Sequence, residues 1–327
     1  MKKYTHAWIA FKAIERLQNA QLTDDNRKFA DYLIEWFHSH KDGVIRGAWY
    51  PDEIIKDNGS SHIMKYAPAP VGSPSPKFRT LPSKSLLYQN GKDSPLHNQP
   101  YTIDAKHNLP ERCEALSHAV IDNLRIIERE EKGSPLAPTA NHAALVLFML
   151  SHYIADAHMP MHCDDRPGEL GTWDMHAAVE DIWEYEVVGY YEVDRVHQRF
   201  LYSPSGYPRL RDVLPASINT PYAGSILKAV DDELSAREFQ ITYGQGNDNV
   251  REYMQAVSQY SYLLSYAWLP AGYDPALVDR VTPQVPGGLP NRDMSIISLA
   301  DAVDAVARVW LRDLRRYMKW EKEIVEG

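Results

Sequence analysis

The sequence is poor in cysteine and contains no long apolar run. Its only cysteines, Cys113 and Cys163, form no CxxC motif, so neither a disulfide framework nor a zinc ribbon is indicated. No window of about 18 or more apolar residues occurs, so we expect no transmembrane helix. The first residues also lack the apolar core of a signal peptide. We therefore expect a cytoplasmic protein, or a secreted one if the sequence is a processed form.

Common catalytic signatures and a strongly basic charge are absent too. The chain has no GxSxG, Walker, GxGxxG or HExxH motif, which removes several hydrolase and nucleotide-binding classes. The net charge of -9 argues against broad electrostatic binding to nucleic acid or anionic membranes, so we expect no stable nucleic-acid complex. No protein partner is indicated. A hydrophobic content of 44% is ordinary for a globular protein and sufficient for a large core.

Strand-like alternation is scarce, and helical spacing of apolar residues dominates the 327 residues. We expect a single all-α domain over 1–327, with the motifs within 1–190 and C-terminal helices within 223–325. The predicted helices cover residues 5–20, 23–40, 111–131, 140–158, a segment that begins at Met175, 223–237, 247–268 and 294–325.

Segments rich in proline, glycine or small polar residues separate these helices. They predict loops at 67–110, 200–222 and 269–292, and a shorter loop at GAWYPD, residues 47–52. Long loops in compact domains are often functional, which draws attention to the excursion at 67–110.

Histidines and carboxylates gather in the stretch HYIADAHMPMH, which follows the apolar run HAALVLFML. His152 and Asp156 are four residues apart and share one face of a helix, and His162 follows after a proline turn. His176 and Glu180 form a second pair with the same spacing. Burying these carboxylates and imidazoles together without a cation is costly, so the pattern predicts a site for zinc or a similar divalent ion. The remaining candidates His118, His142 and His158 stand alone and are interpreted as ordinary hydrogen-bonded histidines.

The order H-x3-D-x5-H, then H-x3-E fourteen residues later, resembles the trinuclear zinc phosphoesterases. These comprise the bacterial zinc-dependent phospholipases C and the fungal and plant single-strand nucleases. Three upstream segments, THAWIAFKAI, GAWYPD and SSHIMKY, resemble the family's N-terminal helix, its Asp loop and its downstream histidine, in the family's order. The matched blocks extend from Met1 to about Glu184. The resemblance implies an all-α fold that binds two to three Zn²⁺ ions per chain.

The resemblance also implies the ligands of each ion. One ion would be held by Asp52, His62, His152 and Asp156, and a second by His162, His176 and Glu180. A third would be held by His6, by Asp156 as a bridge, and by the amine and carbonyl of Met1. The family typically begins with a tryptophan, whereas this sequence begins with Met1, and Asp57 competes with Asp52 as the loop carboxylate.

The activity implied by the resemblance is hydrolysis of phosphate esters by a metal-bound hydroxide, with Asp52 able to orient or deprotonate the attacking water. Glu180 as the last ligand and the spacing of fourteen residues from His162 to His176 resemble the phospholipase C branch. The short N-terminal segment before His6 resembles the nuclease branch. The substrate would be a phospholipid headgroup or a nucleotide. A non-catalytic metal-binding helical protein is the alternative from another class.

Aromatic residues near the expected ligands are candidates for substrate binding. Trp49, Tyr66 and Trp173 could surround a choline-like headgroup by cation–π contact or stack on a nucleobase. Ordinary burial preferences favour the other interpretation, in which most of these rings belong to the core.

Overall fold

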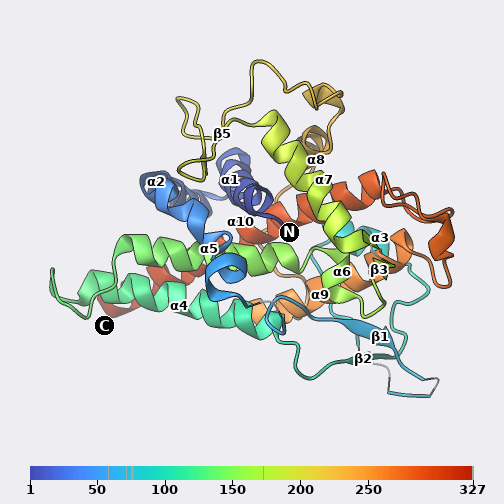
Figure 1. Cartoon of the computed structure of the whole chain (residues 1–327). Helices are drawn as coiled ribbons and strands as arrows, with labels where there is room; N and C mark the ends of the chain where they lie inside the picture. The colour runs from blue at the N-terminus through green and yellow to red at the C-terminus, as the bar shows by residue number, and fades with distance from the viewer. Residues whose placement is uncertain (58, 71, 75–76, 172, 326–327) are drawn as a thin grey trace.

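The structure is a computed structural model that describes residues 1–57, 59–70, 72–74, 77–171 and 173–325. Helices make up most of this part of the chain, and its strands are short and paired in twos (Figure 1). The expected all-α class is confirmed.

The longer helices are α1 (Lys3–Asn19), α2 (Asp24–Gly47), α4 (Leu109–Arg129), α5 (Ala140–Asp156), α7 (Met175–Tyr190), α8 (Ile226–Ala236), α9 (Val250–Trp268) and α10 (Asn291–Val325). The shorter ones are η1 (Pro51–Ile55), α3 (Leu86–Gly91), α6 (Pro160–Cys163), η2 (Tyr222–Gly224) and η3 (Pro275–Leu277). The antiparallel strand pairs are β1 (Tyr66–Pro68) with β2 (Tyr101–Ile103), β3 (Glu169–Leu170) with β4 (Trp173–Asp174), and β5 (Val193–Asp194) with β6 (Arg199–Phe200). Every predicted helix has a counterpart among these elements.

Two loop predictions are wrong in part. At GAWYPD, α2 continues to Gly47, and a π-helical turn, η1, begins at Pro51 after a short connection. Proline suits a first helical position because its fixed backbone angle matches the helix and its missing N–H is not needed there. The excursion at 67–110 contains α3 and most of the β1–β2 ribbon. Ser85 caps the start of α3, where its side chain accepts a hydrogen bond from the Tyr88 amide. The composition of this segment did not predict which of its serines would cap a helix.

Helix α5 lies at the centre of the helical body, in contact with α1, α2, α4 and α10. Nearly all of its side chains from Ala143 onward are buried, as expected for a helix that is apolar on all sides. The carboxyl end of α5 therefore carries His152 and Asp156 into the interior.

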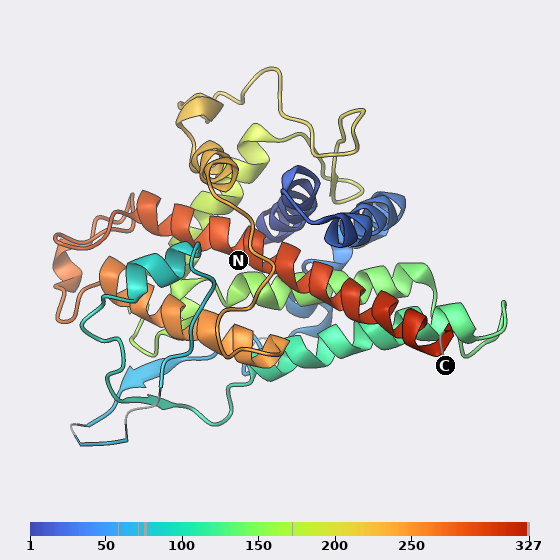
Figure 2. The same cartoon turned by 180° about the vertical axis from the view of Figure 1, so that it is seen from behind.

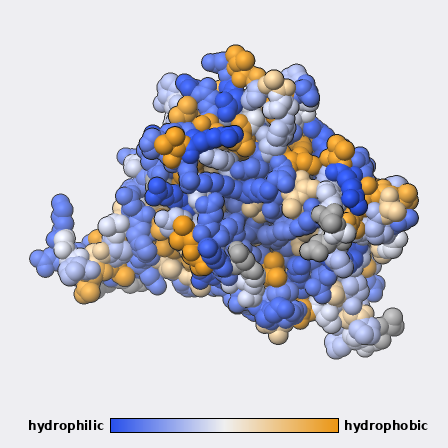
Figure 3. All heavy atoms as spheres, viewed as in Figure 1, coloured by the Kyte–Doolittle hydropathy of each residue, from blue (hydrophilic) through white to orange (hydrophobic). Residues whose placement is uncertain are grey.

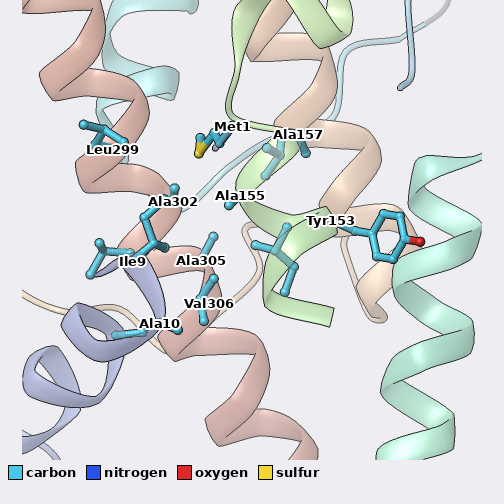
Figure 4. Packing of buried hydrophobic residues seen from close by; sticks show 14 of the residues in the cluster. Met1, Ile9, Ala10, Tyr153, Ala155, Ala157, Leu299, Ala302, Ala305 and Val306 are labelled. Carbon is cyan, nitrogen blue, oxygen red and sulfur yellow. The ribbon is translucent and has the colours of Figure 1, made fainter. Parts of the chain in front are cut away.

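Helix α10 crosses behind α1 and packs on it through small side chains (Figures 1 and 2). Ala302, Ala305 and Val306 of α10 lie in the space shared with Ile9 of α1, and Met1 lies above them near α5 (Figure 4). Small side chains at such a contact let the helix axes approach closely. This packing fixes the start of α1 against the centre of the molecule.

Three helix ends thus meet in the interior: the start of α1, the end of α5 and the start of α7. The N-terminus lies near the middle of the molecule in both views (Figures 1 and 2). Asp174 starts α7 by accepting a hydrogen bond from the His176 amide at 2.9 Å. The fold therefore brings the two His-x3-carboxylate pairs to one place from different helices.

Candidate metal centre

The side chains expected to bind metal lie together at this junction of helix ends. They are Met1, His6, Asp52, His62, His152, Asp156, His162, His176 and Glu180. A cavity of about 290 Å³ opens above them, and its other lining residues are Gly59, Ile63, Lys65 and Met161. The face of the molecule around the N-terminus is mostly hydrophilic (Figure 3). His6 and His152 do not line the cavity and lie beneath it, fully buried.

The first cluster consists of Asp52, His62, His152 and Asp156. Asp52 Oδ1 lies 3.3 Å from His62 Nδ1 and 3.5 Å from His152 Nε2. Asp156 Oδ2 lies 3.2 Å from His152 Nε2 and 3.9 Å from His62 Nδ1. Two ligand atoms that each lie about 2.0–2.2 Å from a tetrahedral zinc are roughly 3.3–3.6 Å apart. The spacing of this cluster therefore fits a tetrahedral ion at its centre.

The second cluster consists of His162, His176 and Glu180. The two Nε2 atoms of the histidines lie 2.9 Å apart, and Glu180 Oε1 lies 2.7 Å from His176 Nε2 and 3.7 Å from His162 Nε2. The half-exposed His176 and the cavity beside it leave this cluster open to solvent. An open side is characteristic of catalytic rather than structural zinc sites.

The third cluster consists of Met1, His6 and Asp156. The Met1 amine lies 3.0 Å from Asp156 Oδ1, and His6 Nε2 lies 3.2 Å from the Met1 carbonyl and 3.5 Å from Asp156 Oδ1. Asp156 therefore directs Oδ2 to the first cluster and Oδ1 to the third. This is the arrangement that a carboxylate bridging two ions requires.

Backbone carbonyls orient two of the imidazoles. His152 Nδ1 lies 2.7 Å from the Ala48 carbonyl, and His162 Nδ1 lies 3.1 Å from the His62 carbonyl. Because a carbonyl only accepts, each Nδ1 donates, and in the neutral ring it is Nε2 that carries the lone pair facing the cluster. His152 Nε2 is fully buried between Asp156 Oδ2 at 3.2 Å and Asp52 Oδ1 at 3.5 Å, and it forms no hydrogen bond of good geometry with either. A metal ion is the group that such an unpaired buried nitrogen accommodates, so the donor set fits zinc.

The charges of the centre are strongly coupled. Burial disfavours the Met1 ammonium, yet the carboxylates of Asp156 and Glu180 outweigh burial and raise the pKa of the amine to about 11. The ammonium lies 2.6 Å from Glu180 Oε1 as well as 3.0 Å from Asp156, so a positive charge already stands between the two carboxylates. A divalent ion bound there would replace that proton, which makes metal binding favour higher pH.

The imidazoles divide into two groups. Burial lowers the pKa of His6 and His62, and it lowers the pKa of His162 to about 3, so these rings are neutral and able to bind metal at neutral pH. For His152, burial acts in the same direction, but Asp156 raises the pKa to about 9. His152 must therefore lose a proton, as the amine must, when a metal takes its Nε2.

Glu184 is a residue that sequence reasoning missed. Its carboxylate accepts hydrogen bonds from the amides of Tyr4 and Thr5 at 3.1 and 2.9 Å and from the Thr5 hydroxyl at 3.0 Å. It thereby holds the first turn of α1, and with it Met1 and His6, against α7. Its position one helical turn after Glu180 was the available signal, because residues four apart share a helix face.

The expected substrate aromatics do not line the cavity. Trp49 is 3% exposed and carries the Lys3 ammonium over its ring at 4.2 Å, and Tyr66 is 0% exposed and packs edge-on against Tyr101. Neither offers a free face to a substrate. Trp173 is half-buried in the β3–β4 hairpin, where the guanidinium of Arg280 lies over it.

The isolated residues fall outside the clusters. The competing carboxylate of Asp57 accepts a hydrogen bond from the Tyr153 hydroxyl at 2.9 Å and belongs to none of the three sets. His158 Nδ1 bonds to the Ile154 carbonyl at 2.8 Å inside the core, and His142 is exposed at the start of α5. His118 lies 3.1 Å from Glu114 on the exposed side of α4.

Comparisons with known proteins add little to this geometry. No family model matches the chain, and no curated protein matches it by sequence. Among solved structures, the alpha-toxin of Clostridium perfringens from avian strain SWCP is 14% identical, with a TM-score of 0.44. The alignment covers 96% of this chain and 63% of the toxin chain, so the chain spans less than two thirds of that protein's length. A similarity of this size carries no argument, and the site is interpreted from its own atoms.

None of the helices in the part of the chain that the structure describes combines the length and the apolar character that a bilayer crossing requires.

Proposed function

We propose that this protein is a zinc-dependent phosphodiesterase of the phospholipase C type, with two to three Zn²⁺ ions held by the three clusters. The observation that carries the proposal is the position of Asp156, whose two carboxylate oxygens face different clusters beneath an open cavity. A structural or storage site would be closed, whereas this one has room for a substrate. Bound zinc would supply an acidified water as nucleophile and would neutralise the phosphoryl oxygens.

The protein's own groups have distinct tasks in this proposal. Both Asp52 and Asp156 line the cavity, but the side chain of Asp52 is 39% exposed and that of Asp156 only 2%. Asp52 can therefore orient or deprotonate the attacking water. Asp156 instead fixes the spacing of the first and third clusters. His152 and His162 are held in their tautomers by the Ala48 and His62 carbonyls, which preorganises the lone pairs.

The test combines metal analysis with a panel of phosphodiesters. Protein purified without chelator should contain two to three zinc ions per chain, and it should hydrolyse bis(p-nitrophenyl) phosphate in a reaction that chelator abolishes and added zinc restores. Phosphatidylcholine vesicles and single-stranded DNA extend the panel to the two substrate classes. A protein that binds no more than traces of transition metal under these conditions contradicts the proposal.

A further inference from the structure

Lys65 is the one non-ligand side chain with a formal charge among the described residues that line the cavity above the clusters. The other non-ligand lining residues are Gly59, Ile63 and Met161. The cavity also lacks a tyrosine, phenylalanine or tryptophan in its described lining. A quaternary ammonium headgroup is normally bound by aromatic rings or carboxylates, and a nucleobase by stacking rings. Apart from the expected metal ligands, the lining offers a lysine instead.

The backbone holds Lys65 at the cavity. Residues 62–66 alternate in burial, so that Met64 and Tyr66 enter the core while Ile63 and Lys65 are only partly buried. The Met64 amide donates to the His162 carbonyl at 3.1 Å, and the Lys65 amide donates to His107 Nδ1 at 3.3 Å. The segment is therefore attached directly to a ligand of the second cluster.

Among the described residues, no ion pair or hydrogen bond involves the Lys65 ammonium. Other cations near the N-terminus and the second cluster are paired: Lys2 with Asp181, Lys3 with Glu53 at 4.0 Å, and Arg166 with Asp164 at 2.7 Å. Over the ranges that the structure describes, no carboxylate forms an ion pair with Lys65, although its side chain is half-buried. A half-buried, unpaired cation beside a phosphoester site has the chemistry to receive a second anion.

We propose that Lys65 determines substrate specificity by binding a second phosphate, so that the preferred substrate is a phosphodiester whose alcohol is a phosphorylated polyol headgroup. The inference rests on the proposed function and names its substrate class. The absence of stacking rings from the described lining and the net charge of -9 favour such a headgroup over a nucleic acid.

Three chromogenic esters that share one scissile bond test the inference. They are the p-nitrophenyl phosphodiesters of glycerol, of glycerol 3-phosphate and of choline. In the zinc-loaded protein we expect the phosphorylated ester to have a KM about tenfold lower than the glycerol ester, and the choline ester to have the highest KM. Raising the ionic strength from low salt to about 1 M, where the Debye length is about 3 Å, should remove most of the difference.

Variants of Lys65 separate its role from a merely structural one. Lys65→Gln should raise the KM of the phosphorylated ester about tenfold and that of the glycerol ester less than about threefold, Lys65→Arg should restore the preference, and Lys65→Glu should reverse it toward choline. Lys106→Gln is the matched control, because Lys106 precedes His107, the residue that accepts a hydrogen bond from the Lys65 amide, but pairs with Asp104 at 2.8 Å. Calorimetric binding provides a readout independent of turnover: glycerol 1,3-bisphosphate should bind more tightly than glycerol 3-phosphate in the parent protein, Lys65→Arg and Lys106→Gln, and no more tightly in Lys65→Gln.

The outcomes are distinguishable. Zinc-dependent hydrolysis with equal KM values for the three esters, or an equal loss for all three in Lys65→Gln, overturns this inference and leaves the proposed function intact. Absence of zinc and of hydrolysis overturns both. Vesicles that contain a phosphorylated inositol lipid, compared with the soluble ester, show whether the headgroup is taken from a membrane surface. A preference for oligothymidylate over all three esters contradicts the headgroup class.

Discussion

Replacing Asp156 with asparagine is expected to remove more metal than replacing Glu180 with glutamine. Asp156 contributes Oδ2 to the first cluster, 3.2 Å from His152 Nε2, and Oδ1 to the third cluster, 3.0 Å from the Met1 amine. Glu180 contributes Oε1 to the second cluster, 2.7 Å from His176 Nε2. An amide keeps the shape of either side chain but loses the charge. Asp156→Asn therefore weakens two clusters and Glu180→Gln chiefly one.

The size of the effect follows from the buried charge. At a separation of about 4 Å and an effective dielectric constant of about 20, one pair of unit charges contributes about 4 kcal/mol. That energy corresponds to about a thousandfold in affinity. Since Asp156 is 1% exposed, solvent screens this loss little. We expect a parent protein with about three zinc ions to retain about one in Asp156→Asn and about two in Glu180→Gln.

The assay is elemental analysis after dialysis against a zinc-buffered solution, with hydrolysis of bis(p-nitrophenyl) phosphate measured on the same samples. Circular dichroism should show that both variants keep their helices, since the apolar packing of α5 and α10 does not involve these carboxylates. Asp57→Asn is the matched control, because Asp57 is a nearby carboxylate that bonds to Tyr153 and belongs to no cluster. Equal losses of metal and activity in the two variants would refute the bridging role of Asp156.

Three further predictions concern other parts of the molecule. Residues fused ahead of Met1 convert its buried amine into an amide and crowd the third cluster, so an N-terminal tag should lower zinc content and activity, and a C-terminal tag of equal length should lower neither. Glu184→Ala removes the carboxylate that holds the first turn of α1 and should cost about 1–3 kcal/mol in urea unfolding, whereas Asp181→Ala on the exposed side of α7 should cost less than about 1 kcal/mol. Burial raises the pKa of Asp313 to about 7 from 3.8, so the folded state favours the neutral carboxyl over the carboxylate. The stability present below pH 4 is lost as pH rises toward 7, by up to about 4 kcal/mol. Asp313→Asn should therefore raise the Tm at pH 8 more than at pH 4, and a variant equally destabilised at both pH values would contradict this cause.

Much of the fold was present in the sequence as local periodicity. The apolar run before His152 predicts a buried helix, and α5 is the central helix of the structure. Periodicity did not predict the cap of α3 at Ser85 or the π-helical turn that begins at Pro51. Both features depend on contacts between a few atoms rather than on a repeated pattern of apolar residues. The antiparallel ribbon of β1 and β2 pairs Tyr66 with Ile103. These residues are far apart in the sequence, and local periodicity cannot predict a pairing over such a separation.

For the candidate site, the sequence by itself determined which carboxylates and imidazoles form i, i+4 pairs, because four residues make about one helical turn. His152 with Asp156 and His176 with Glu180 follow from spacing alone. Only the tertiary structure decided that the pairs face each other, since α5 is placed by packing against α1 and α10, and α7 by packing against α1 and α8.

The direction of each oxygen and nitrogen was likewise decided by the tertiary structure. Asp156 divides its two oxygens between clusters, and the carbonyl of Ala48 sets the tautomer of His152. The burial of Trp49 and the position of Lys65 at the cavity depend on which face of each segment the core covers. A linear sequence specifies the side chains, but their solvent exposure and their partners arise only when distant segments pack together.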